Sequence, residues 1–139
     1  MQKIREVMSS DVHTISPDSS IEEAAQEMRD GDFGLLPVAN NGQLLGVITD
    51  RDITVRAVAE GKSPDTQIKE VMSGGVISAN EDDTVEDAAR IMSEHQIRRL
   101  PIVDGKHHLV GIVSLGDFAV DASDIEPVME ALEGISSPP

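Results

Sequence analysis

The sequence contains no cysteine, tryptophan or tyrosine, and Phe33 and Phe118 are its two phenylalanines. Without cysteine, the chain has no disulfides, thiolate metal ligands or cysteine nucleophile. The scarcity of aromatic rings removes the platforms on which single-stranded nucleic acids stack their bases. No run of about 20 apolar residues occurs, and the N-terminus carries no secretion signal, so we expect no membrane span and a cytoplasmic protein.

Basic residues are also few, because 11 Lys and Arg stand against 26 Asp and Glu and give the chain a net charge of −15. This charge repels nucleic acids and anionic membranes, so we expect neither as a partner. The simpler interpretation is a well-solvated surface. The length of 139 residues suits one compact domain that buries roughly two-thirds of its unfolded surface.

Catalytic motifs are absent from the sequence. It contains no phosphate-binding loop of the G-x-x-x-x-G-K type, no G-x-S-x-G elbow and no H-E-x-x-H helix. No carboxylate is marked by an apolar context as a general acid. The adjacent His107 and His108 provide only two ligands and make a poor metal site. We therefore expect neither an enzyme nor a required metal or cofactor.

An internal repeat dominates the sequence. Its two copies are offset by 64 residues, and by 65 after one residue is gained at a predicted turn. The matching stretches are IREVMSSDV at 4–12 and IKEVMSGGV at 68–76, SIEEAAQEM at 20–28 and TVEDAARIM at 84–92, LPV at 36–38 and LPI at 100–102, and GVITDRD at 46–52 and GIVSLGD at 111–117.

Each copy reads as strand, helix, strand, strand, helix, which predicts an α/β protein of the α+β type. Short strands are expected at 11–16 and 75–79, and a hairpin around Asn-Asn-Gly. Ser19 or Ser20 can cap the first helix, and Thr84 its counterpart. The buried faces expected for these helices are Ile21, Ala24, Ala25 and Met28, which precede a stop at Gly31, and Val85, Ala88, Ala89 and Met92. A further helix follows each hairpin, the first ending at Gly61 and the second lying in SLGDFAVDAS.

The repeat boundaries predict the domains. We expect a first repeat at 1–61, a linker at 62–67, a second repeat at 68–122 and an acidic tail at 123–139. Each repeat is too small to bury its sheet alone, so we expect the two to pair. The tail could form a short amphipathic helix around Val128, Met129 and Leu132, or fray.

The repeated hydroxyl–aspartate pairs could serve either as helix caps or as ligand-binding residues. Thr49 can cap a helix, with Asp52 completing a capping box. Alternatively, the Asp52 carboxylate can accept hydrogen bonds from both hydroxyls of a ribose, while the helix start attracts an anion. The residues leave both interpretations open, and the same holds for Ser114 and Asp117.

The ordered set of motifs, found twice at one spacing, resembles a tandem pair of CBS domains, the so-called Bateman module. The resemblance runs from Ile4 to about Ala122 and is similar to small bacterial stand-alone CBS proteins. It implies two β-α-β-β-α repeats packed sheet to sheet with pseudo-two-fold symmetry. It further implies a regulatory module that binds AMP, ADP, ATP, NAD or S-adenosylmethionine in clefts between the repeats and assembles as a homodimer.

The same resemblance implies composite clefts, in which the hydroxyl–aspartate pair of one repeat faces the first strand and the pre-proline segment of the other. One cleft would consist of Ser114, Asp117, Ser9, His13, Gly34 and Leu35. The other would consist of Thr49, Asp52, Ser73, Ile77, Arg98 and Arg99.

The two copies differ before the proline. The second has Arg98 and Arg99, which suit a phosphate, whereas the first has Gly34 and Leu35 and no cation. Arg51 and Arg56 are further candidate phosphate contacts or a solvated helix face. We expect a regulator that binds an adenosine-containing nucleotide and signals to a target protein. The alternative is a ligand-free structural or interaction module whose Thr/Ser–Asp pairs only cap helices.

Overall fold

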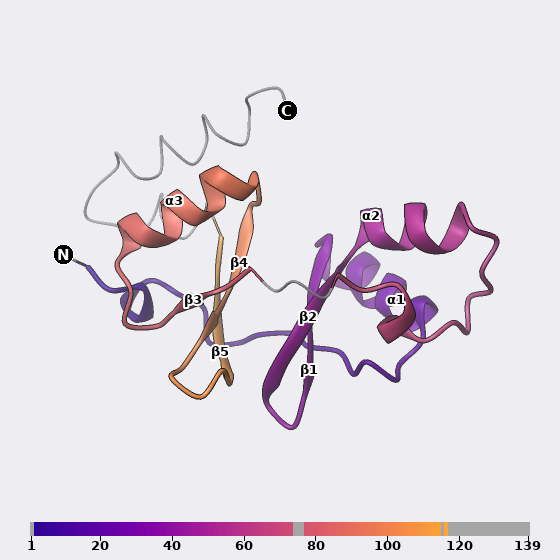
Figure 1. Ribbon diagram of the computed structural model, residues 1–139, viewed down its shortest axis with the longest axis horizontal. Coiled ribbons are helices and arrows are strands. Elements are labelled where there is room, and N and C mark those ends of the chain that lie inside the picture. Colours follow the sequence, from indigo (N-terminus) through magenta and orange to yellow (C-terminus); the bar gives the residue numbers. More distant parts are fainter. Residues whose placement is uncertain (1, 74–76, 115, 117–139) are drawn as a thin grey trace. The chain divides into compact units, whose positions relative to one another are not determined.

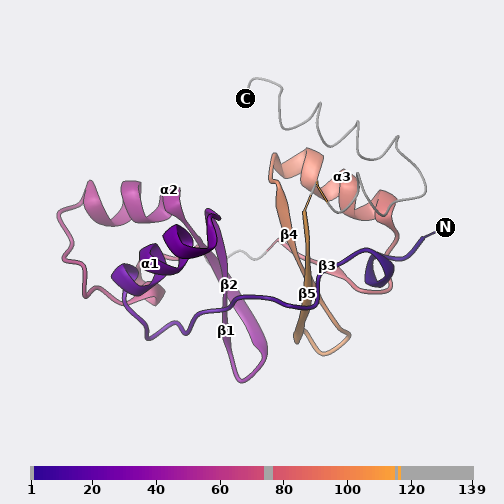
Figure 2. The same cartoon turned by 180° about the vertical axis from the view of Figure 1, so that it is seen from behind.

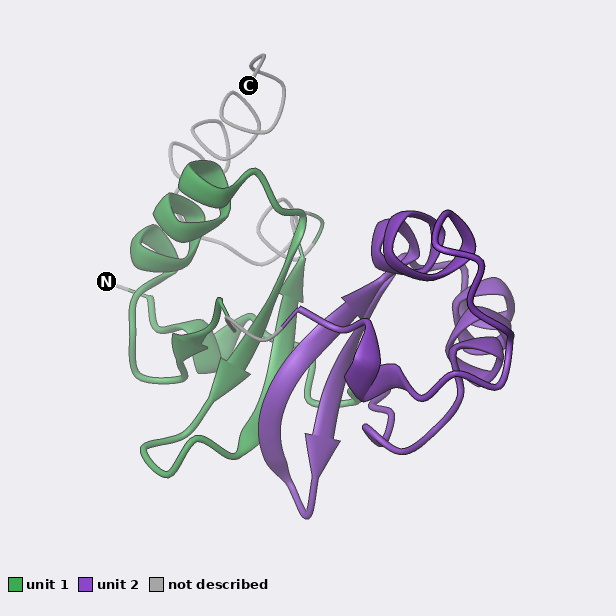
Figure 3. Ribbon diagram, turned by 45° about the vertical axis from the view of Figure 1, so that its right-hand side comes forward, with its two compact units in different colours: residues 1–12, 77–139 green, residues 13–76 purple. Residues whose placement is uncertain are grey.

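The computed structural model describes residues 2–73, 77–114 and 116, which form two compact units (Figure 3). Unit 1 consists of residues 1–12 and 77–139, and unit 2 of residues 13–76. Unit 1 contains the 3-10 helix η1 (Ile4–Glu6), β3 (Ala79–Asn80), α3 (Val85–His95), β4 (Arg99–Val103) and β5 (Leu109–Ser114). Unit 2 contains α1 (Ile21–Gly31), β1 (Leu35–Asn40), β2 (Gln43–Thr49), α2 (Asp50–Asp52), the π-helix η2 (Ile53–Val58) and the 3-10 helix η3 (Ile68–Glu70).

The sheet of unit 2 is built on the antiparallel hairpin β1–β2, which pairs Leu35 with Thr49 at its open end. Single bridges extend it on both sides, since Ile15 pairs in parallel with Val38 and Ser73 pairs antiparallel with Val47. Helices α1 and α2 lie on the same side of this hairpin (Figures 1 and 2).

The sheet of unit 1 follows the same plan. Strand β3 runs parallel to β4, and β4 runs antiparallel to β5, with Arg99 opposite Ser114. Ser9 then pairs antiparallel with Ile112 on β5. Both units therefore mix helices with a small sheet, and the α+β fold class is confirmed.

The two units exchange the opening segments of the repeats. Ile4 and Val7, from the first repeat, lie in the core of unit 1, whereas Ile68 and Val71, from the second, lie in the core of unit 2. Backbone hydrogen bonds hold both exchanged segments in place. Ile4 N–H donates to the Asp83 carbonyl, and Ile68 N–H donates to the Ser19 carbonyl, each at 2.8 Å. The compact units therefore divide the chain differently from the predicted repeats at 1–61 and 68–122. The boundaries of those repeats stay a prediction.

The helix signals are largely confirmed. Ser20, rather than Ser19, caps α1 by accepting from Glu23 N–H at 3.1 Å, and Thr84 caps α3 in the same way through Asp87. Three of the four predicted face residues of α1 are buried, but Ala25 is exposed, so that prediction was wrong. Gly31 ends α1 as predicted, while the left-handed residue that follows is Asp32, with φ 56°.

Other elements depart from the predictions. Residues 11–16 form a single bridge at Ile15 instead of a strand. Of the strand expected at 75–79, residues 75 and 76 lie outside the described residues, and β3 begins at Ala79. The helix after β2 begins at Asp50 as expected, but it continues from Ile53 as a π-helix and ends at Val58 instead of Gly61. The helix predicted in SLGDFAVDAS lies almost wholly outside the described residues. None of the helices in the described part of the chain is long and apolar enough to cross a membrane.

The choice between the two candidate cap residues gives a first prediction. Ser20→Ala should lower the free energy of unfolding by about 1 kcal/mol, because it removes the acceptor for Glu23 N–H. Ser19→Ala is the matched control and should change stability by less than about 0.5 kcal/mol. Urea unfolding measures both, and equal losses for the two variants would contradict the assignment of Ser20 as the cap.

Candidate functional site

Thr49 and Asp52 form a capping box where β2 ends and α2 begins. The Thr49 hydroxyl accepts from Asp52 N–H, and the Asp52 Oδ2 accepts from Thr49 N–H, both at 3.0 Å. Asp52 is 8% exposed and is the one buried charged residue among those described. The helix-capping interpretation is therefore realised in the structure, and it fixes the orientation of the carboxylate.

Ser73, which belongs to the second repeat, contacts the Asp52 carboxylate. Its hydroxyl lies 3.3 Å from Asp52 Oδ1 and 3.4 Å from Oδ2. The backbone explains this position, because Ser73 N–H donates to the Val47 carbonyl at 3.0 Å and ties the segment to β2. Thr49, Asp52 and Ser73, three residues of one predicted cleft, thus lie together in unit 2.

Arg56 lies one helical turn beyond Asp52. Its Nε is 3.8 Å from Asp52 Oδ1, and its Nη1 donates to the Met72 carbonyl at 3.4 Å. The Arg56 side chain is about half exposed, so its contact with the carboxylate is weak. Oδ2 thus accepts from the Thr49 backbone N–H, the Ser73 hydroxyl lies within reach of both oxygens, and Arg56 approaches Oδ1. Such a carboxylate can accept hydrogen bonds from a ligand's hydroxyls.

Three other predicted residues lie in unit 2. Leu35 faces Thr49 across the hairpin, and the Gly34 carbonyl accepts from Asp50 N–H at 3.0 Å. The exposed His13 places its ring 5.6 Å from that of Phe33, tilted by 37°.

The remaining predicted residues belong to unit 1. Ser9 bridges to Ile112, two residues before Ser114, and Arg99 faces Ser114. Arg98 is exposed, and Ile77 packs on the unit's core. Asp117 lies outside the described residues. The predicted joining of Ile77, Arg98 and Arg99 with Asp52, and of Ser9 and Ser114 with His13, stays a prediction.

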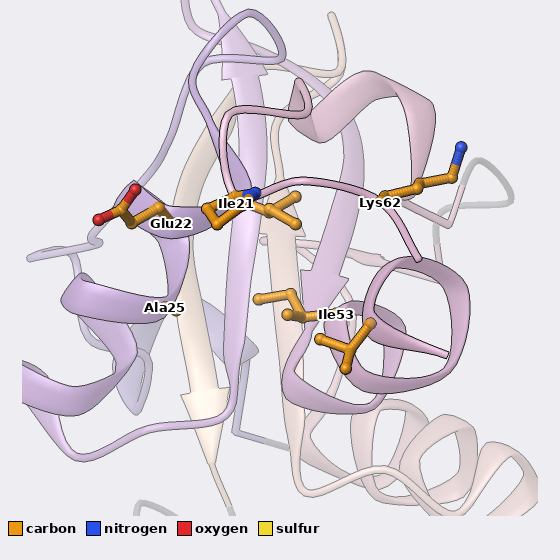
Figure 4. A pocket seen from close by; sticks show the side chains of 7 residues that line it. Ile21, Glu22, Ala25, Ile53 and Lys62 are labelled. Atoms are coloured by element: carbon orange, nitrogen blue, oxygen red, sulfur yellow. The ribbon is translucent and has the colours of Figure 1, made fainter. Parts of the chain in front are cut away.

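A pocket that the sequence did not predict opens in unit 2 (Figure 4). It has a volume of about 310 Å³, and its walls are mostly apolar. The charged ends of Glu22 and Lys62 extend outward on opposite sides. The lining residues are Ile21, Glu22, Ala25, Ile53, Val58, Lys62 and Pro64. The pocket accounts for the exposure of Ala25, and the apolar residues of the 53–58 segment were its only sequence signal.

His107 and His108 lie in the β4–β5 turn. His108 Nδ1 is 3.3 Å from Asp104 Oδ2, and hydrogen bonds, chiefly from the His108 backbone N–H, hold the pKa of the Asp104 carboxyl below its ordinary value. Within the described residues, no cluster of three His, Cys, Asp or Glu side chains could hold a metal ion.

Known proteins share this architecture. The CBS domain family model matches residues 4–58 and 68–121. The CBS domain-containing protein YhcV of Bacillus subtilis is 45% identical over 136 residues, which are 98% of this chain and 96% of that protein. The crystal structure of the CBS domain pair of protein MJ0100, in complex with 5′-methylthioadenosine and S-adenosyl-L-methionine, superimposes with a TM-score of 0.74 at 33% identity and covers 86% of this chain and 94% of that one.

One enzyme is also similar over part of its length. The inosine-5′-monophosphate dehydrogenase of Methanocaldococcus jannaschii is 40% identical over 118 residues, which are 84% of this chain and 23% of the enzyme. The similarity therefore covers a minor part of that enzyme.

Proposed function

Because the chain belongs to the CBS domain family, of which it carries two copies in tandem, we propose that it is a regulatory protein that binds an adenosine-containing nucleotide. The observation that carries the proposal is Asp52, a buried carboxylate held in one orientation by Thr49 and Ser73. The adenosyl ligands in the similar MJ0100 domain pair support the ligand class.

The chemistry at Asp52 follows from its hydrogen bonds. Both hydroxyls of a ribose can donate to one carboxylate, and such charge-assisted bonds are short and strong. The N–H groups of Asp50, Arg51 and Asp52 at the start of α2 already donate within the protein, so we propose that side chains hold the 5′ group of the ligand. Arg98 and Arg99 are proposed to supply cations for phosphates at this cleft. Ser114 and Asp117 are proposed to play the same roles as Thr49 and Asp52 at the other cleft.

A second candidate function is supported by the capping box itself. Thr49 and Asp52 satisfy each other's backbone groups without any ligand. The pair could therefore serve stability alone, in a ligand-free module that acts through protein contacts. In either case we propose a binding protein and not an enzyme, because YhcV matches along almost its whole length and the dehydrogenase matches over 23% of its own.

Titration calorimetry of the wild-type protein with AMP, ADP, ATP, NAD and S-adenosylmethionine tests the proposal. We expect saturable binding of at least one compound. The bound ligand should raise the free energy of unfolding by about RT ln(1 + [L]/Kd), and the melting temperature should rise with it. No heat and no thermal shift with any of the five would favour the ligand-free module.

We also propose that the protein is a homodimer formed through its helices. The pocket beside α1 is apolar, and Val55 and Val58 on η2 are 45% and 65% exposed. A second copy would cover these side chains, and burial of apolar area stabilises association.

Light scattering should therefore give a mass near twice 14.9 kDa at micromolar concentration. Val58→Lys should shift the protein toward the monomer, because it places a charge on the apolar surface. Leu45→Lys is the control, since Leu45 is also exposed (39%) but lies on β2. A monomeric wild type, or equal dissociation by both variants, would contradict this interface.

A further inference from the structure

Methionine provides all the sulfur atoms of this cysteine-free chain. Four of its six methionines lie among the described residues, and they fall into two classes. Met28 on α1 and Met92 on α3 are buried, with 7% and 0% exposure. Met8 and Met72 are partly exposed and pack against the cores of unit 1 and unit 2. A dissolved oxidant therefore reaches Met8 and Met72 more readily than the buried pair.

Met72 lies in the exchanged opening segment of the second repeat, where that segment crosses β2. A Cβ atom added at Gly46 would lie 3.5 Å from Met72 Sδ and 3.6 Å from its Cε, so the thioether rests against the backbone of β2. The Met72 carbonyl accepts from Arg56 Nη1 at 3.4 Å. An oxygen atom added to the sulfur on the side of Gly46 would press against this backbone.

The residue that follows, Ser73, contacts the proposed ligand-binding carboxylate. Its hydroxyl lies 3.3 Å and 3.4 Å from the two oxygens of Asp52. Its N–H donates to the Val47 carbonyl at 3.0 Å, and its carbonyl accepts from Val47 N–H at 3.4 Å. Because Met72 and Ser73 share one peptide bond, a movement of Met72 away from β2 carries the Ser73 hydroxyl away from Asp52.

We propose that Met72 is an oxidation site at which a peroxide weakens ligand binding to Asp52. The inference rests on the proposed function, because the affected cleft is the one that contains Asp52 and Ser73. A lone pair of the thioether sulfur attacks one oxygen of hydrogen peroxide, an S–O bond forms, the O–O bond breaks, and the second oxygen leaves as water. The sulfur loses two electrons and the peroxide gains them.

The product explains the expected loss of affinity. A sulfoxide is polar, whereas the thioether of Met72 packs on the apolar core of unit 2. Leaving the new oxygen without a hydrogen-bond donor in this position is unfavourable, so the oxidised side chain turns toward water. The exchanged segment then leaves β2, and Asp52 loses the hydroxyl that helps to fix its orientation.

Hydrogen peroxide and peptide mass spectrometry test the selectivity of the site. In the folded protein, Met72 should be oxidised at least about fivefold faster than Met92, and in urea the two rates should be nearly equal. Met92 is the matched control, because it is the same side chain in a fully buried position. This measurement needs no ligand.

Two variants separate Met72 from Met8, its counterpart in unit 1. Met8→Leu keeps the Met72 thioether, and Met8→Leu/Met72→Leu removes both, while leucine preserves the apolar packing. Titration calorimetry before and after peroxide treatment uses whichever of AMP, ADP, ATP, NAD and S-adenosylmethionine binds most tightly. Peroxide should weaken its binding by about threefold or more in Met8→Leu and by less than about 1.5-fold in the double variant.

The outcomes distinguish the oxidation site from the proposed function. Oxidation of Met72 no faster than that of Met92 in the folded protein would overturn the oxidation site. Equal losses of affinity in the single and double variants would do the same, and both results leave the proposed function intact. If none of the five compounds binds the untreated protein, both proposals are wrong.

Discussion

Asp52→Ala is expected to weaken the binding of AMP or ADP by about a hundredfold or more. The substitution removes the acceptor for two ribose hydroxyls, and hydrogen bonds to a charged group are worth roughly 1.5–3 kcal/mol each. About 1.4 kcal/mol corresponds to a factor of ten in affinity, so two such bonds exceed a hundredfold. Titration calorimetry on the folded variant gives the value directly.

The second repeat provides a control for the capping role of Asp52. Asp87 forms the same box at the start of α3, where its Oδ2 accepts from Thr84 N–H at 3.1 Å. Asp87→Ala should cost about 1 kcal/mol of stability, as loss of a cap does, and leave nucleotide affinity unchanged. If Asp52→Ala loses similar stability but binds nucleotide like the wild type, the pair is only a cap.

Gly46→Ala is expected to lower the free energy of unfolding by about 1–3 kcal/mol, because the site is already filled by another part of the backbone. A Cβ at Gly46 would lie 2.6 Å from the carbonyl oxygen of Ser73. The exchanged segment would have to move away from β2, and with it the hydroxyl that contacts Asp52. We therefore expect a melting temperature lower by several degrees and a weaker nucleotide site.

Gly111 occupies the equivalent place in unit 1, where a Cβ would lie 2.5 Å from Met8 Sδ and 3.0 Å from the Ser9 carbonyl oxygen. Gly111→Ala should destabilise the protein less, because the nearest atom belongs to a flexible side chain. Gly105→Ala is the control, since nothing lies within 4 Å of its added Cβ. Similar melting temperatures for Gly46→Ala and Gly105→Ala would contradict the close crossing at Gly46.

Local signals in the sequence were sufficient for the helices and hairpins. Ser20 and Thr84 precede apolar residues at helical spacing, and both cap helices. The turn between β1 and β2 was predicted from its Asn-Gly pair, which is typical of tight hairpins. In the structure Asn41 and Gly42 adopt the positive φ values, 53° and 82°, that such turns require. Each of these features depends on neighbours a few residues apart.

Features that depend on distant contacts could not be derived from residue patterns. Ile4 lies in the core of unit 1 and Ile68 in the core of unit 2. The sequence does not predict this exchange, because the opening segments of the two repeats are so similar that either could fit either core. Ser73 was placed with Asp52 only through the resemblance to a family. Residues 11–16 have the β-branched composition of a strand, yet Ile15 alone pairs with β1, at Val38. The residue pattern after Asp52 predicts a helix but does not distinguish a π-helix from an α-helix.

The most direct test of the central claim, that Asp52 holds a ribose, is a double-mutant cycle between protein and ligand. AMP and 2′-deoxy-AMP are titrated into wild-type protein and into Asp52→Ala. We expect the wild type to prefer AMP by about tenfold or more, the value of one hydrogen bond to a charged acceptor, and Asp52→Ala to bind the two compounds almost equally. An equal preference for AMP in both proteins, or none in the wild type, would contradict the claim.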